Sequence, residues 1–318
     1  MRNQKTLILD RDWDYLFILD ACRYDIFERV YGDYLSGRLI PVKSAGSGTR
    51  EWAVNTFENV KMDDVVYVSG NPWFNSKFPM KGFDARKHFH EIVDVWDWGW
   101  KEDASVRPKE MEKGVEKAED EYPRRRKIIH YMQPHNPYLE LLGKRPPRLY
   151  DVISSITSFL ETASSKGTTP IGINEEGEMS LRRRLGEWLK KKIGKKGFFE
   201  MRSVLSLPPA TIGEVIFREG RDGLHYYYEK NLRMALESVS NCCSSIQGKA
   251  VVSADHGEFL GEKASEIKQK SNSSVKQKLD KAADETLKVF GGGNDPILHG
   301  HHNLNNPILR TVPWLEVK

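Results

Sequence analysis

Residues 251–262 read VVSADHGEFLGE, a short apolar run that ends in a carboxylate and an imidazole. A run of this length rich in valine predicts a buried strand, and the polar pair marks its carboxyl end. Similar runs lie at 15–19 (YLFIL), 64–69 (DVVYVS) and 127–132 (KIIHYM), with helical patterns between them. Strands that alternate with helices predict an α/β fold, with a mainly parallel central sheet flanked by helices on both faces. The predicted helices cover 23–31, 50–60, 108–121 and 225–246.

Reactive side chains gather at the carboxyl ends of these predicted strands. Asp20 follows the first strand, His135 lies just beyond the third, and Asp255 and His256 follow the fourth. Ligands of such sheets bind beyond the carboxyl ends of the strands. A carboxylate and an imidazole can converge on one cation if the chain turns there, and Gly257 permits a turn. Asp20 is equally placed to cap the following helix, and both roles can hold.

Three further segments carry candidate chemistry. In KSAGSGT, residues 43–49, small residues lead to Thr49 and a predicted helix, whose dipole would favour an alkoxide there. The alternative is that Thr49 only caps that helix. In HYMQPHNPY, residues 130–138, prolines fix a loop that can hold His135 toward a cleft, whereas His130 is equally a core histidine. LHGHHN, residues 298–303, offers imidazoles to a metal or an oxyanion and precedes an expected strand over Ile308–Val317.

Composition limits the class of protein. The chain has 318 residues, 39% hydrophobic and 30% charged, which suits one α/β domain over 1–318 that carries insertions. The net charge of +4 is too small to indicate a nucleic-acid-binding protein. Three cysteines cannot form a disulfide framework, and the apolar runs near the N-terminus are too short for a signal peptide or a membrane span. These features predict a cytoplasmic protein.

Two segments have the composition of insertions. Within the basic insertion, 164–200, residues 181–196 would form a helix with one apolar face and a lysine- and arginine-rich remainder. Such a helix is either a solvated surface helix or a contact with an anionic membrane surface. The second insertion, 262–293, is polar, has almost no aromatic residues and ends in three glycines. This composition predicts a mobile lid or a long surface loop.

In order and spacing, these segments resemble the sulfatase-like branch of the alkaline phosphatase superfamily over nearly the whole chain. DHGEFLGE, followed later by VPW, is the most specific part of the resemblance. In that family an aspartate ends the first core strand, as Asp20 does, and a Cys, Ser or Thr nucleophile follows, where this chain has Thr49. The DHG motif supplies two metal ligands, here Asp255 and His256. The resemblance therefore implies a divalent metal held by Asp20, Thr49, Asp255 and His256.

The same resemblance implies the substrate contacts and the number of metals. His135 takes the place of a substrate-binding histidine, and His301, with His302 as its competitor, takes the place of the residue that contacts the ester oxyanion. Apart from the resemblance, Arg23 and His130 are further candidate substrate contacts, although Arg23 could instead form a surface pair with Asp25. The second-metal motif of alkaline phosphatase has no match, so we expect one metal. Aspartate and histidine ligands suit Mn²⁺ or Zn²⁺, and a carboxylate-dominated shell also tolerates Mg²⁺ or Ca²⁺.

The nucleophile position departs from the sulfatases. Sulfatases convert a cysteine of a C-x-P/A-x-R motif into formylglycine, and none of Cys22, Cys242 and Cys243 lies in such a motif. Thr49 therefore favours phosphate esters, as in the threonine-using phosphoglycerol transferases of the superfamily. The implied reaction is a double displacement at Thr49 that ends in hydrolysis or transfer, with a glycan- or lipid-linked ester as a candidate substrate. The alternatives are a sulfatase that acts on sulfate esters and a non-catalytic binding protein on the same fold.

Overall fold

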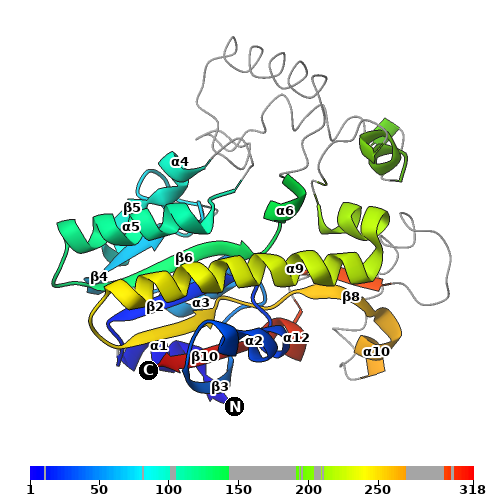
Figure 1. Cartoon of the computed structure of the whole chain (residues 1–318). Helices are drawn as coiled ribbons and strands as arrows, with labels where there is room; N and C mark the ends of the chain where they lie inside the picture. The colour runs from blue at the N-terminus through cyan, green and yellow to red at the C-terminus, as the bar shows by residue number, and fades with distance from the viewer. Residues whose placement is uncertain are drawn as a thin grey trace, which may run out of the picture.

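The chain forms an α/β fold in which helices flank a large central sheet (Figure 1). The computed structural model describes residues 1–10, 12–80, 82–100, 105–142, 191–192, 194, 196–203, 209, 211–269, 297–301 and 304–318. In sheet order the eight described strands are β1 (Arg2–Asn3), β3 (Gly37–Lys43), β10 (Thr311–Val317), β7 (Ala250–Ala254), β2 (Tyr15–Asp20), β6 (Arg126–Pro134), β4 (Met62–Ser69) and β5 (Phe89–Asp94). A separate antiparallel pair is formed by β8 (Phe259–Lys263) and β9 (Ile297–Gly300).

The sheet is mainly parallel, as the sequence predicts. Within this eight-stranded sheet only β10 runs antiparallel to its neighbours β3 and β7, and its other described pairs are parallel. All six residues of β2 are buried, which fits a central strand that is covered on both faces. Because β2 lies between β7 and β6, the carboxyl ends of these three strands meet at one edge of the sheet.

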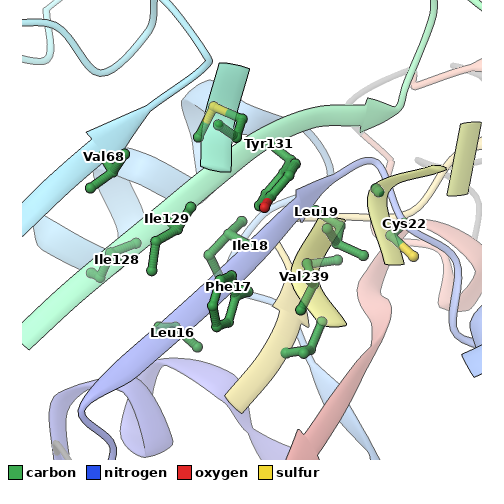
Figure 2. Close-up of a cluster of buried hydrophobic side chains, with 14 of the residues drawn as sticks. Leu16, Phe17, Ile18, Leu19, Cys22, Val68, Ile128, Ile129, Tyr131 and Val239 are labelled. Atoms are coloured by element: carbon green, nitrogen blue, oxygen red, sulfur yellow. The ribbon is translucent and has the colours of Figure 1, made fainter. Parts of the chain in front are cut away.

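Helices cover both faces of the sheet. They are α1 (Gln4–Asp10), α2 (Tyr24–Val30), α3 (Thr49–Phe57), α4 (Val95–Gly99), α5 (Pro108–Glu121), α6 (Leu139–Leu142), α9 (Ile212–Ser245), α10 (Ala264–Gln269) and α12 (Pro307–Arg310). Neighbouring residues of a strand point to opposite faces, and β6 identifies the two sides. Tyr131 meets Ser238 of α9, whereas His130 meets Trp52 of α3. Figure 2 shows the core side chains of β2 and β6, with Tyr131 and Val239 on the α9 side.

Local sequence signals explain where several helices begin. Thr49 is the first residue of α3, as expected for a hydroxyl residue after a run of small ones. Pro108 occupies the first turn of α5, where its missing N–H costs no hydrogen bond. The side chain of Thr211 accepts a hydrogen bond from the Glu214 amide and caps α9.

The expected strand over Ile308–Val317 is wrong at its start. Residues Pro307–Arg310 form the short helix α12, and β10 begins only at Thr311. Asn306 explains the difference, because its side chain accepts a hydrogen bond from the Ile308 amide and Pro307 is set for a first helical turn.

Most of the two predicted insertions lies outside the described residues. Of 262–293, the first residues belong to β8 and α10, where Ala264 and Ile267 are buried with Phe259, and 270–293 are not described. Of 164–200, only 191–192, 194 and 196–200 are described, and these are helical. The predicted helix over 181–196 therefore lies largely outside the described part. Among the described helices, none is both long and apolar enough to cross a membrane.

Candidate active site

The carboxyl ends of β2 and β7 place two carboxylates side by side. Leu19 pairs with Ala254 in the parallel ladder, so the residues that follow, Asp20 at the end of β2 and Asp255 just after β7, lie at the same edge of the sheet. Oxygen atoms of these two carboxylates lie within 4.8 Å of each other. Burial, together with the neighbouring Asp255, raises the pKa of Asp20 well above its ordinary value. A buried pair of like charges of this kind is suited to a bound cation.

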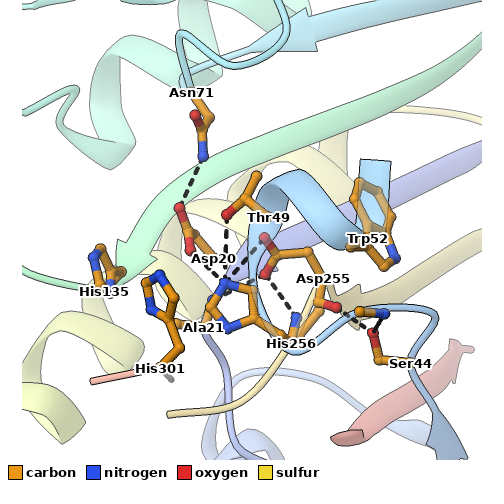
Figure 3. A network of polar contacts seen from close by, with 12 residues as sticks. Asp20, Ala21, Ser44, Thr49, Trp52, Asn71, His135, Asp255, His256 and His301 are labelled. Carbon is orange, nitrogen blue, oxygen red and sulfur yellow. Dashed lines mark hydrogen bonds and ion pairs between the residues drawn. The ribbon is translucent and has the colours of Figure 1, made fainter. Parts of the chain in front are cut away.

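Four atoms of the ligand type converge at this edge. His256 Nε2 lies 3.4 Å from Thr49 Oγ1, 3.5 Å from Asp20 Oδ1 and 3.5 Å from Asp255 Oδ2 (Figure 3). Ligands bound tetrahedrally to zinc at ~2.0–2.2 Å are separated from one another by ~3.3–3.6 Å. The donor set and its three distances to His256 Nε2 therefore suit a divalent transition metal.

Hydrogen bonds orient the atoms of this group. His256 Nδ1 lies 2.8 Å from the Gly257 carbonyl and donates to it, and burial lowers the pKa of His256, so Nε2 is the unprotonated nitrogen. Asp255 Oδ1 accepts from the amides of Ala21 and His256, at 3.0 and 2.8 Å. Asp255 Oδ2 has no hydrogen-bond partner among the described residues. One oxygen of Asp255 is thus fixed by the backbone, and the other is left for a ligand.

Thr49 is presented by a packed loop at the start of α3. Gly48 precedes it in extended conformation, and Thr49 is 8% exposed. The Ser44 hydroxyl donates to the Asp255 carbonyl and accepts from the Gly46 amide, which ties the loop to the end of β7. A side chain at Gly46 would place its Cβ 2.2 Å from the Trp52 amide nitrogen, so only glycine fits there. The loop therefore sets the threonine hydroxyl opposite His256.

A second cluster of charged groups lies beside the first. His135 Nδ1 is 2.9 Å from Glu258 Oε1, His301 Nδ1 is 3.9 Å from the same oxygen, and Glu258 is fully buried. Burial opposes charge on His135, but the Glu258 carboxylate outweighs it and raises the pKa of His135 to about 9. Burial also opposes charge on Glu258, yet His135 lowers the pKa of Glu258 to about 2. The pair is therefore charged at neutral pH.

His301 joins the two clusters. Its ring centroid is 4.9 Å from that of His256 and 5.6 Å from that of His135 (Figure 3). The ligand-type atoms of His135, Glu258 and His301 lie within 4.8 Å of one another, so this cluster is a second group with metal-ligand character. The structure thus brings the predicted catalytic residues Thr49, His135 and His301 to one place.

The other predicted substrate contacts have different surroundings. The Arg23 guanidinium pairs with Asp25 at 2.9 and 2.7 Å and contacts Glu262, so it links the end of β2 to β8. His130 is fully buried, and burial lowers its pKa to about 4. Its Nε2 lies 3.8 Å from Asp255 Oδ2, which places it behind the carboxylate and away from solvent. His302 lies outside the described residues.

Three residues of the site were not predicted from the sequence. Asn71 Nδ2 donates to Asp20 Oδ2 at 2.8 Å, and its position just after β4 is the strand-end signal that could have identified it. Glu258 lies within the DHGE motif but was given no role. The Tyr228 hydroxyl donates to the Ala21 carbonyl at 2.7 Å and accepts from the Arg23 amide at 2.9 Å. It holds Ala21 at a φ of 59°, and nothing in the local sequence indicates this contact.

The reason for glycine at position 257 also differs from the expectation. The φ angle of Gly257 is not positive. A Cβ at this position would lie 2.1 Å from the Ile308 carbonyl oxygen, and the Gly257 amide donates to the Leu309 carbonyl at 2.9 Å. Glycine is needed because α12 packs directly on the chain here, and not because the turn needs an unusual backbone angle.

Comparison with known proteins finds no match to any family model or to any curated protein. Two solved structures are similar in fold. The integral membrane lipooligosaccharide phosphoethanolamine transferase A from Neisseria meningitidis is 11% identical, with a TM-score of 0.42; the match covers 95% of this chain and 47% of that one. The C-terminal periplasmic domain of phosphoethanolamine transferase EptC from Campylobacter jejuni is 13% identical, with a TM-score of 0.40, and the match covers 95% and 77%. This chain therefore spans about half the length of the first and about three quarters of the second.

The predicted cytoplasmic location is contradicted by these two structures. One is described as an integral membrane protein and the other as a periplasmic domain. The prediction rested on a low cysteine count and on the lack of a long apolar run, and neither property fixes the compartment in which a chain works. The cytoplasmic assignment is therefore withdrawn.

Proposed function

We propose that this chain is a metal-dependent enzyme that transfers or hydrolyses a phosphate ester through Thr49. The observation that carries the proposal is the convergence of Thr49 Oγ1, Asp20 Oδ1 and Asp255 Oδ2 on His256 Nε2, at 3.4–3.5 Å. A hydroxyl, two carboxylates and an unprotonated imidazole nitrogen at one point are the parts of a cation site with a nucleophile in it. Their chemistry favours Zn²⁺ or Mn²⁺.

The first half-reaction is assigned to Thr49. Its oxygen attacks phosphorus in line with the leaving group, so a Thr49–phosphorus bond forms as the ester bond breaks. The hydroxyl proton of Thr49 passes to the leaving oxygen, which departs as the alcohol. The start of α3 favours the developing alkoxide through the helix dipole. Asp20, Asp255 and His256 would hold a divalent cation, which would supply Lewis-acid charge beside the Thr49 hydroxyl and the ester.

The second cluster is assigned to the oxygens of the transferring group. His135 stays protonated because Glu258 is beside it, and His301 lies between His135 and His256. Both can donate to the non-bridging oxygens, a contribution of about 3–4 kcal/mol for each well-placed donor. Water or an acceptor alcohol then attacks phosphorus and gives up its hydroxyl proton as the Thr49–phosphorus bond breaks, and a proton returns to the Thr49 oxygen to restore the hydroxyl.

The phosphate ester is preferred to the sulfate ester because position 49 is a threonine and cannot form formylglycine. The alternative of a non-catalytic binding protein does not explain why the Thr49 hydroxyl lies beside the ligand-type atoms of Asp20, Asp255 and His256. A glycan- or lipid-linked phosphate ester remains the candidate natural substrate.

The test is turnover of aryl phosphate monoesters, aryl phosphate diesters and an aryl sulfate with Mn²⁺, Zn²⁺, Mg²⁺ and Ca²⁺ in turn. A lipid carrying phosphoethanolamine, the group named for both solved structures, is included as a donor. Wild-type protein should turn over a phosphate ester only with metal, and Thr49→Ala should not. Turnover of the sulfate alone would identify a sulfatase, and no turnover of any ester would favour the binding protein.

A further inference from the structure

His130 and Tyr67 form a buried contact that the proposed reaction does not use. His130 Nδ1 lies 2.8 Å from the Tyr67 hydroxyl, and both side chains are fully buried. On its other side, His130 Nε2 faces Asp255 Oδ2 at 3.8 Å. The three groups therefore form a row from β4, through β6, to the carboxylate at the end of β7.

Aromatic side chains close off this row. The Tyr67 ring stacks on Phe74 at 4.3 Å and packs against Phe89 at 4.7 Å between centroids. Trp52 and Phe74 also meet the His130 ring edge-on, at 5.9 and 5.5 Å. In this apolar surrounding, the hydroxyl proton of Tyr67 has one acceptor within the described residues, His130 Nδ1.

The hydroxyl proton fixes the tautomer of the imidazole. If His130 carried its proton on Nδ1, it would donate to the tyrosine oxygen and leave the Tyr67 proton buried without an acceptor, which costs about 1–3 kcal/mol. If Tyr67 donates instead, Nδ1 is the acceptor and the neutral ring carries its proton on Nε2. That N–H then faces a carboxylate oxygen 3.8 Å away, whereas the other tautomer would set the lone pair of Nε2 against the lone pairs of that oxygen.

We infer that Tyr67 holds His130 in the Nε2–H form, so that His130 is a positioning residue that turns an N–H toward Asp255 Oδ2, 3.8 Å away, and is not a metal ligand. The inference rests on the metal site proposed above. By distance alone His130 could be a metal ligand or a residue behind the ligands, because Asp20, His130 and Asp255 have ligand-type atoms within 4.8 Å of one another. The tautomer decides between these two roles. At 3.8 Å this N–H does not occupy Asp255 Oδ2 with a hydrogen bond, but its dipole stabilises the charge of the carboxylate from behind, as groups around metal ligands do.

The decisive measurement is the ¹⁵N NMR spectrum of histidine-labelled protein, because protonated and bare ring nitrogens resonate in separate regions. Signals of His130 and His256 are assigned from His130→Gln and His256→Gln. The spectrum is recorded without metal and after one equivalent of Zn²⁺. We expect His130 Nε2 to be protonated in both states, while zinc shifts His256 Nε2.

Two matched tyrosine variants test the coupling. Tyr67→Phe should leave His130 as a mixture of tautomers and lower Zn²⁺ affinity about 10-fold or more, as losses behind a ligand do. Tyr131→Phe is the control, since Tyr131 is an equally buried tyrosine whose hydroxyl meets Ser238 at 3.1 Å on the opposite face. It should leave the His130 spectrum and Zn²⁺ affinity unchanged, whatever its effect on thermal stability.

An unprotonated Nε2 on His130, in either state, would contradict the inferred role, as would Zn²⁺ binding directly to that nitrogen. Unchanged tautomer and affinity in Tyr67→Phe would also overturn it. If zinc shifts neither ring, the proposed metal site fails, and the tautomer in metal-free protein still decides whether His130 is held as an N–H donor.

Discussion

In each of the proposed metal ligands Asp20, Asp255 and His256, one polar side-chain atom is occupied by a hydrogen bond and the other is left for a metal. Asp20 Oδ2 accepts from Asn71, Asp255 Oδ1 accepts from two backbone amides, and His256 Nδ1 donates to the Gly257 carbonyl. The atoms left for a metal are the ones that converge opposite Thr49. Orientation of this kind, by partners behind the ligands, is typical of built metal sites.

Metal content tests the roles of these side chains. Asp255→Asn keeps the size of the side chain but removes the charge and one ligand oxygen, so Zn²⁺ affinity should fall by at least about 100-fold. The matched control is Asp94→Asn, because Asp94 binds Ser76 and Trp96 away from the four ligands. Elemental analysis after dialysis should give one metal per wild-type chain and per Asp94→Asn chain, and none in Asp255→Asn. Retained metal in Asp255→Asn would contradict the assignment, and two per wild-type chain would mean that the His135 cluster also binds an ion.

The His135–Glu258 ion pair predicts a pH-dependent stability. The folded pKa of His135 is raised from 6.5 to about 9, so its contribution is complete below 6.5 and is lost as pH rises through about 9. The folded pKa of Glu258 is lowered from 4.5 to about 2, so its contribution is complete above 4.5 and is lost as pH falls through about 2. Glu258→Gln should therefore destabilise the protein most between these limits, by about 3 kcal/mol.

Urea unfolding at about pH 6 and about pH 9.5 measures this difference. The difference in the free energy of unfolding between wild type and Glu258→Gln should be smaller at the higher pH. Glu110→Gln is the control, because Glu110 is similarly buried and pairs with Lys113 at 3.0 Å, and lysine keeps its charge over this range. An equal loss of unfolding free energy for Glu258→Gln at both pH values would show that the His135–Glu258 pair does not titrate over this range.

At the scale of elements, the site depends on a close approach between the turn after β7 and α12. The Gly257 amide donates to Leu309 of α12, and the Arg310 side chain donates to the Ser44 carbonyl in the loop before α3. A short helix near the chain end thereby connects the loop that carries Thr49 with the turn that carries Asp255. Movement of α12 would displace the nucleophile relative to the ligands.

Gly257→Ala tests this connection. The new Cβ would lie 2.1 Å from a backbone oxygen, which cannot swing aside as a side chain can, so a loss of about 2–3 kcal/mol of stability is expected. Gly32→Ala is the control, because nothing lies within 4 Å of the Cβ it would add. Thermal unfolding should show a lower midpoint for Gly257→Ala only, together with weaker metal binding. Equal midpoints for the two variants would mean that α12 does not pack on the turn as described.

The elements that the sequence predicted are those with the strongest apolar signals. The central strands β2, β4, β6 and β7 are apolar over most of their length and were found, whereas β3 is mostly half-buried or exposed and contains Pro41, and it was not. The start of β10 was wrongly predicted because Pro307–Arg310 is too short for its apolar residues to distinguish a capped helical turn from a strand. The Tyr228 contact with Ala21 could not be foreseen, since it joins residues 207 positions apart.

At the scale of the whole molecule, strand order assembles the site. Sheet neighbours β7, β2 and β6 are far apart in the sequence, and their carboxyl ends deliver Asp255, Asp20 and His135 to one edge. The general rule that ligands bind at this edge identified these residues from the sequence alone. The rule could not assign a separate role to each residue. The ion pair of His135 with Glu258 and the position of His130 behind Asp255 both depend on side-chain packing between strands.

Covalent trapping at Thr49 tests the central claim most directly. Protein incubated with metal and an aryl phosphate ester is quenched in acid, digested and sequenced by mass spectrometry. Thr49→Ser keeps the hydroxyl and Ser47→Ala is the nearby control, since the Ser47 hydroxyl is directed to Glu51 at 2.7 Å. We predict phosphate on Thr49 in wild type and in Ser47→Ala, on the serine in Thr49→Ser, and none in Thr49→Ala, because only a covalent route leaves phosphate on the chain. Turnover by wild type and by Thr49→Ala alike, with no phosphate on residues 44–56 in either, would contradict the claim.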